Sequence, residues 1–148
     1  SSHVEELRSK MNELASTLPE YATVMSMYGV GKTFGPQLIA EIGDISNFSH
    51  REALTAFAGV DPGVDQSGTH NSKSNKASKC GSNRLRKTLF QIMSTLLQTA
   101  PENDKVYQFL VKKRAEGKPY YVYMTAGANK FLRIYYGKVK ECIRNLEQ

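Results

Sequence analysis

The sequence predicts an all-α fold for this chain of 148 residues. Apolar residues recur at three- and four-residue spacings in several segments, as in helices with one buried face. No segment alternates apolar and polar residues for long, as a half-buried strand would. Glycine or proline follows most of the helical segments. We therefore expect a helical core, a long flexible basic loop and extended N- and C-terminal helices.

The first expected helix runs over residues 4–18, with Val4, Leu7, Met11, Leu14 and Leu18 on one face. We interpret residues 1–18 as a helical arm that a coiled coil could continue upstream, and residues 19–148 as one helical domain. The chain opens at Ser1 within this pattern, so we expect it to be a fragment of a longer protein.

A tight turn is expected at Gly29-Val30-Gly31, between a short helix after Pro19 and a helix over 33–42. Helix, apolar-Gly-apolar-Gly and helix form the pattern of a helix-hairpin-helix, here over residues 20–43. Gly29 and Gly31 would let the backbone approach a phosphate at the second helix's N-terminus, where Lys32 adds a cation. The alternative is a plain helical hairpin whose glycines only make the turn.

A capping box of the form Ser49-x-x-Glu52 predicts a helix that ends at Gly59, where we expect a basic loop over 59–83. From Gln66 to Ala100 the sequence contains no Asp or Glu. It contains six cations there: Lys73, Lys76, Lys79, Arg84, Arg86 and Lys87. A loop of this charge repels itself unless a polyanion neutralises it, and nucleic acid is the obvious partner.

Three further helices complete the expected chain, over 83–99, 104–115 and 119–146, and we treat the many tyrosines of the last one as structural.

The net charge is +6, divided unevenly between the two halves. Residues 1–65 hold four Lys or Arg against nine Asp or Glu, or −5, and residues 66–148 hold sixteen against five, or +11. This predicts that the second half meets a phosphate backbone; a solvated basic surface is the alternative.

Cys80 and Cys142 show no zinc-binding spacing, the three histidines are scattered, and no carboxylate pair has metal-binding spacing, so we predict no metal site. No apolar run is long enough for a transmembrane helix and no signal peptide is evident, so a cytoplasmic protein without a membrane partner is expected.

The remaining chemical candidate is Ser67, whose hydroxyl could approach a bulky group because Gly68 follows it. Nearby cations could stabilise a pentavalent phosphate. A solvated, unreactive serine-rich loop is the alternative.

An ordered series of motifs runs from Val24 to Phe90. The pieces are Gly29-Val30-Gly31, residues 38–45 (LIAEIGDI), Phe48, residues 54–62 (LTAFAGVDP), Ser67-Gly68, Ser78-Lys79 with Gly81, and Leu85-Arg86. This series resembles the C-terminal domain of insertion-sequence transposases of the "one-ten" class, also called DEDD serine transposases or bridge-RNA-guided recombinases. The resemblance covers about half the chain closely and its C-terminal helices loosely.

The resemblance implies that Ser67 is the nucleophile, which forms a phosphoserine link to a cut DNA end, and that the basic residues hold DNA or a guide RNA. Such proteins carry Mg²⁺ in a RuvC-like nuclease domain, joined through a coiled coil, and act as homo-oligomers in the bacterial cytoplasm. That domain is absent from these 148 residues, so we expect this piece to need no cofactor and to be inactive alone. The family's Lys-Arg-Gly-Asn appears as Lys79-Cys80-Gly81-Ser82-Asn83, which weakens any role for that asparagine.

The sequence thus favours a transposase domain that binds DNA and supplies a serine for strand cleavage and exchange. The alternative is a non-catalytic helix-hairpin-helix module for nucleic-acid binding or oligomerisation.

Overall fold

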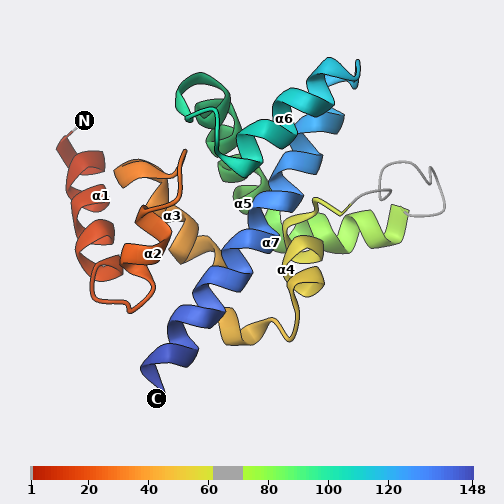
Figure 1. The fold of residues 1–148 in the computed structure, drawn as a ribbon. Helices are drawn as coiled ribbons and strands as arrows, with labels where there is room; N and C mark the ends of the chain where they lie inside the picture. The colour runs from red at the N-terminus through yellow and green to blue at the C-terminus, as the bar shows by residue number, and fades with distance from the viewer. Residues whose placement is uncertain (1, 62–71) are drawn as a thin grey trace.

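The computed structural model describes residues 2–61 and 72–148, and the side chains of all of these except 72–82. Every regular element in these ranges is helical, which confirms the predicted fold class (Figure 1). The elements are α1 (Ser2–Ala15), α2 (Tyr21–Met25), α3 (Gly31–Ile42), the 3₁₀ turn η1 (Ile45–Asn47), α4 (Arg51–Ala58), α5 (Ser72–Thr99), α6 (Lys105–Ala115) and α7 (Tyr120–Leu146).

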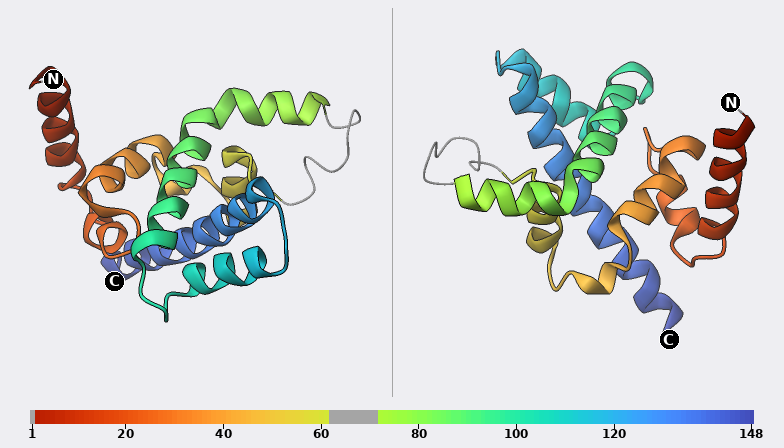
Figure 2. Two further views of the ribbon diagram at one scale, coloured as in Figure 1. Left: turned by 90° about the horizontal axis from the view of Figure 1, so that it is seen from above. Right: turned by 180° about the vertical axis from the view of Figure 1, so that it is seen from behind.

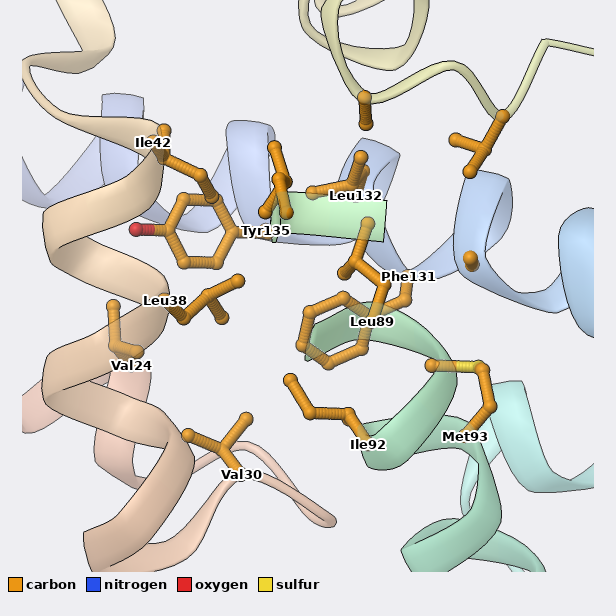
Figure 3. Close-up of a cluster of buried hydrophobic side chains, with 14 of the residues drawn as sticks. Val24, Val30, Leu38, Ile42, Leu89, Ile92, Met93, Phe131, Leu132 and Tyr135 are labelled. Atoms are coloured by element: carbon orange, nitrogen blue, oxygen red, sulfur yellow. The ribbon is translucent and has the colours of Figure 1, made fainter. Parts of the chain in front are cut away.

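Helix α7 is the centre of the fold and packs against α2, η1, α4, α5 and α6 (Figure 1). Its buried side chains include Met124, Phe131, Leu132, Tyr135 and Val139, at the spacing of one helix face. Figure 3 shows how this face meets apolar side chains of α3 and α5. Each such side chain, when fully buried, contributes about 1.5–3 kcal/mol to folding. The core therefore fixes α3 and α5 relative to α7.

Helix α1 lies at the edge of the fold and packs against α3 (Figure 1). Ala15 is its buried residue. The predicted apolar face remains open to solvent, with exposures of 45% for Val4, 55% for Leu7, 39% for Met11, 65% for Leu14 and 41% for Leu18. The periodicity therefore predicts a helix here, but the helix ends at Ala15, three residues earlier than expected, and the apolar stripe is not part of this core.

Helix α5 begins at Ser72, eleven residues before the start predicted at Asn83. The loop predicted over 59–83 is shorter than expected, because residues 72–83 are helical; residues 62–71 lie outside the described part. The Ser/Asn/Lys tract has no apolar periodicity, but it joins an established amphipathic helix and needs no nucleus of its own. Figure 2 shows that the first part of α5 bends away from the rest. Gly/Ser pairs are a common cause of such bends, and α5 contains Gly81-Ser82.

The N-terminus of α4 also differs from the prediction. The N-cap is His50 rather than Ser49, and its Nδ1 accepts a hydrogen bond from the amide of Ala53 at 3.2 Å. His50 has extended backbone angles, so the helix begins at Arg51. An imidazole nitrogen here takes the place that the serine hydroxyl would have had in a capping box.

Candidate nucleic-acid interface

The turn between α2 and α3 has the backbone that its glycines predict, with φ of +86° at Gly29 and +61° at Gly31. Their surroundings differ. A Cβ atom at Gly29 would lie 2.8 Å from Leu96 Cγ and 3.1 Å from the carbonyl oxygen of Ile92. A Cβ atom at Gly31 would meet nothing within 4 Å. Gly29 is therefore required for packing against α5, whereas Gly31 lies at an open surface.

Helix α3 begins at Gly31, two residues earlier than predicted, and its N-terminus is exposed and uncapped. Val30 occupies the N-cap position and makes no side-chain hydrogen bond to the helix. Gly31, Lys32 and Thr33 are all exposed. Unpaired amides at the positive end of a helix favour an anion, and Lys32 adds a full charge there. The structure has a helix on each side of the turn, and the helix-hairpin-helix with its nucleic-acid contact stays a prediction.

The basic residues of α5 whose side chains are described are Arg84, Arg86 and Lys87. Arg84 and Lys87 are exposed, and Arg86 donates a hydrogen bond to Asn83 Oδ1 at 2.9 Å. Across the described residues, no carboxylate lies within ion-pair distance of these three cations. Among the described residues, their charge is therefore not compensated by an ion pair.

Two contacts show that α3 runs antiparallel to α5. Gln37 Nε2 donates a hydrogen bond to Thr88 Oγ1 at 2.8 Å, while Gly29 packs against Ile92 and Leu96 further along α5. Lys32 and the Arg84–Lys87 group are consequently at opposite ends of the contact between these helices. Among the predicted basic residues whose side chains are described, Lys32 therefore does not cluster with the three of α5.

Lys73, Lys76 and Lys79 lie in the first part of α5, where the backbone alone is described. Ser67, the predicted nucleophile, lies in residues 62–71, outside the described part. Its role therefore stays a prediction.

The chain that leads to this segment is anchored by two side-chain hydrogen bonds. Thr55 Oγ1 donates to Asp61 Oδ1 at 2.5 Å, and Asn129 Nδ2 donates to the carbonyl oxygen of Val60 at 3.2 Å. Asn129 is 8% exposed and comes from α7. Asn129 is not among the predicted site residues, although a polar residue on the apolar face of an amphipathic helix is a usable signal.

Comparison with known proteins supplies the family. The family described as "Transposase IS116/IS110/IS902 family" matches residues 21–108, more than half of the chain. The chain belongs to this transposase family. The resemblance inferred from the motifs is thereby confirmed, and every predicted site residue of this transposase chain falls inside the matched range.

Two curated relatives match nearly the whole transposase chain. Both are described as a "Pilin gene-inverting protein", one from Moraxella bovis and one from Moraxella lacunata. Each is 26% identical over 145 residues, which cover 95% of this chain and 44% of the relative. The chain thus spans less than half the length of these relatives. No solved structure matches it significantly.

The described part of this transposase chain contains no group of three or more His, Cys, Asp or Glu residues arranged to hold a metal ion. Asp44, near the end of α3, has a structural contact instead. The amide and hydroxyl of Ser46 both donate to its carboxylate, which lowers the pKa of Asp44, and the amide contributes more. None of the described helices has the length and apolar character needed to cross a membrane.

Proposed function

We propose that this chain is the domain of a transposase that binds DNA and supplies Ser67 as the nucleophile for strand cleavage and exchange. The observation that carries the binding proposal is the acid-free cationic stretch of α5. Residues 66–100 contain six Lys or Arg and no Asp or Glu, and Arg84, Arg86 and Lys87 form no ion pair with any carboxylate that the structure describes. A phosphate backbone would supply the missing negative charge. The open N-terminus of α3 at Gly31 and Lys32 would be a second contact with that backbone.

In the proposed reaction, Ser67 Oγ attacks a backbone phosphorus while the ester bond to one strand end breaks. The products are a phosphoserine link and a free hydroxyl on the other strand end, and the serine proton passes to a base or to solvent. Mg²⁺, held by a nuclease domain of the full-length protein, would stabilise charge on the phosphate. A guide RNA is proposed as a further partner in the bacterial cytoplasm. These proposals rest on the family resemblance of the Ser67-Gly68 motif.

A covalent-capture experiment tests the nucleophile. The full-length protein, Mg²⁺ and a nicked target-like DNA are combined, and the protein–DNA adduct is sought after denaturation. We expect an adduct that peptide mapping places on Ser67 and that Ser67→Ala abolishes. Ser74→Ala, in the same serine-rich tract, is the matched control and should leave the adduct unchanged. A preparation that transposes without an adduct would contradict the proposal and favour a non-catalytic binding module.

DNA binding is tested separately on the 148-residue chain. If all six cations of α5 contact phosphates of a duplex, the slope of log K against log salt should be about −5. Replacing the six with glutamine should remove most of this slope. A slope near zero for the unsubstituted chain would exclude the binding proposal and leave an oligomerisation module.

A second candidate function, self-association through α1, is favoured by the exposed apolar stripe of that helix. Val4, Leu7, Met11 and Leu14 alternate in spacing between three and four, as at the a and d positions of a coiled coil, and Leu18 follows just beyond the helix end. Met11, Leu14 and Leu18 also line an apolar groove of about 610 Å³ beside Pro36 and Ile39. We propose that a second copy of the chain covers this stripe.

Sedimentation distinguishes this association from a monomer. Leu7→Lys combined with Leu14→Lys should convert a dimer to a monomer, because charge would enter the apolar contact. Ser9→Lys with Ser16→Lys adds the same charge at exposed polar positions with the same spacing, and should leave the dimer intact. A monomer at all concentrations of the unsubstituted chain would rule out the association.

A further inference from the structure

A cleft of about 430 Å³ is lined by residues of α4, α6 and α7. Arg51 comes from the start of α4 and Phe109 from α6, while Asn129, Lys130 and Arg133 come from α7. These residues are far apart in the sequence, and none of them belongs to the predicted DNA-binding set. The cleft is thus a basic site separate from the turn at Gly31 and from the cationic stretch of α5.

The positive charge of this cleft is only partly compensated. Arg51 Nε lies 3.3 Å from Glu52 Oε1, an exposed pair that solvent screens. Within the described residues, no carboxylate lies within ion-pair distance of Lys130 or Arg133. These two are three residues apart on α7, where like charges repel each other. An anion in the cleft would relieve that repulsion.

Contacts around Phe109 explain why Lys130 stays at the cleft. Lys130 Nζ lies 5.3 Å from the centre of the Phe109 ring, and Lys113 Nζ lies 5.5 Å from it. Lys113 also pairs with Glu116 at 3.6 Å, so its charge is compensated. Among the residues that the structure describes, Lys130 has no such carboxylate, and it lies three residues before the exposed Arg133.

We propose that this cleft binds a backbone phosphate of a nucleic acid, as a contact additional to α3 and α5. An arginine fork and a lysine point charge are the groups that proteins use for phosphate. Asn129 lines the same cleft and holds Val60, from which the chain continues to the segment containing Ser67. A strand held here would therefore lie close to Val60. The inference rests on the proposed DNA-binding function.

Lys130→Met combined with Arg133→Gln tests the site in the 148-residue chain. Binding to a 20-base-pair DNA duplex is measured by fluorescence anisotropy between 50 and 200 mM salt, with an RNA duplex as a second arm. Two lost phosphate contacts should lower the magnitude of the salt slope by about 2 and weaken binding about 60-fold at 0.1 M salt. The duplex that shows this loss identifies the strand that the cleft holds.

Lys140→Met with Arg144→Gln is the matched control on the same helix. It removes the same charge, and Lys140 has its own aromatic contact, with its Nζ 5.7 Å from the centre of the Tyr136 ring. These residues do not line the cleft. The control should weaken binding less than 3-fold, whereas Lys130→Arg with Arg133→Lys should retain nearly full binding. Thermal unfolding of each variant establishes that the fold is intact.

Equal losses in the cleft variant and the control would mean that only net charge matters, and would overturn the site. Unchanged binding in the cleft variant would also overturn the site. The DNA-binding proposal would survive that result if the replacements in α5 still removed the dependence of log K on log salt. No binding by the unsubstituted chain to either duplex would remove both proposals together.

Discussion

Replacing Gly29 and Gly31 individually with alanine separates a packing glycine from a surface glycine in the same turn. Both have positive φ, so both variants carry a similar backbone cost of about 1–2 kcal/mol. Only the Cβ atom at Gly29 would press on α5, at 2.8 Å from Leu96 Cγ and 3.1 Å from the Ile92 carbonyl oxygen. Both neighbours are buried in the core, and the oxygen belongs to the helix backbone.

The extra cost at Gly29 is that of overpacking a core, typically about 1–3 kcal/mol. The free energy of unfolding should therefore fall by about 2–5 kcal/mol for Gly29→Ala and by about 1–2 kcal/mol for Gly31→Ala. For a chain of this size, 1 kcal/mol corresponds to a Tm change of about 2–4 °C. Alanine also lowers the conformational entropy of the unfolded chain relative to glycine, which offsets part of the loss in stability by the same amount in both variants.

Urea unfolding followed by helical circular dichroism measures the difference between the two variants. The midpoint should be lower for Gly29→Ala, while the dependence on urea stays unchanged, because the same surface becomes exposed. Equal midpoints would refute the reasoning, since the close approach to α5 would then not be what requires glycine at position 29.

Four further substitutions probe helix α7. Gly127→Ala should destabilise the fold because its Cβ atom would collide with Leu110, whereas Gly137→Ala, on an open part of the same helix, should stabilise it by up to about 1 kcal/mol in urea unfolding. Asn129→Ala should cost about 1–3 kcal/mol, since it leaves a buried carbonyl unpaired; a smaller loss would mean that water replaces the amide. Burial, followed by a nearby glutamate's charge, raises the pKa of Tyr135. The stability that the raised pKa of Tyr135 contributes is therefore fully present below pH 10 and is lost as the pH rises above it. In Tyr135→Phe, the free energy of unfolding should fall less at alkaline pH.

Local patterns in the sequence predict those features that depend on neighbouring residues. The spacing of Leu85, Leu89, Ile92, Met93 and Leu96 predicts one face of α5, and all five are buried. The two glycines predict a turn that needs positive φ, and both have it. In each case the determining contacts or backbone angles belong to a short stretch of chain.

Helix boundaries and partners depend on contacts that a local pattern does not contain. The polar first part of α5 has no apolar face, so periodicity places the helix start at Asn83 instead of Ser72. The stripe on α1 predicts a buried face in the same way as α5, yet the structure leaves it exposed. Whether a stripe is buried is decided by which surface it meets, and periodicity carries no such information.

The cleft on α7 could not have been predicted for a related reason. Arg51, Phe109, Lys130 and Arg133 come together only because α4 and α6 both pack on α7. Read singly, each is an ordinary surface residue of an amphipathic helix. Their common location makes them a candidate site, since no carboxylate in the described part of the chain pairs with Lys130 or Arg133.

Because α3 packs antiparallel on α5, we expect Lys32 and Arg84 to contribute independently to DNA binding. Gln37 of α3 donates a hydrogen bond to Thr88 of α5. Lys32 precedes Gln37 by five residues, and Arg84 precedes Thr88 by four. Because the helices are antiparallel, these offsets add to about 13 Å along their axes. That separation corresponds to about four steps of 3.4 Å along a DNA strand, so the two cations would contact different phosphates. The effects of Lys32→Gln and Arg84→Gln on the binding free energy should therefore add within about 0.5 kcal/mol in anisotropy measurements. A double variant that binds no more weakly than either single variant would indicate that both cations act on one phosphate, and would contradict this prediction.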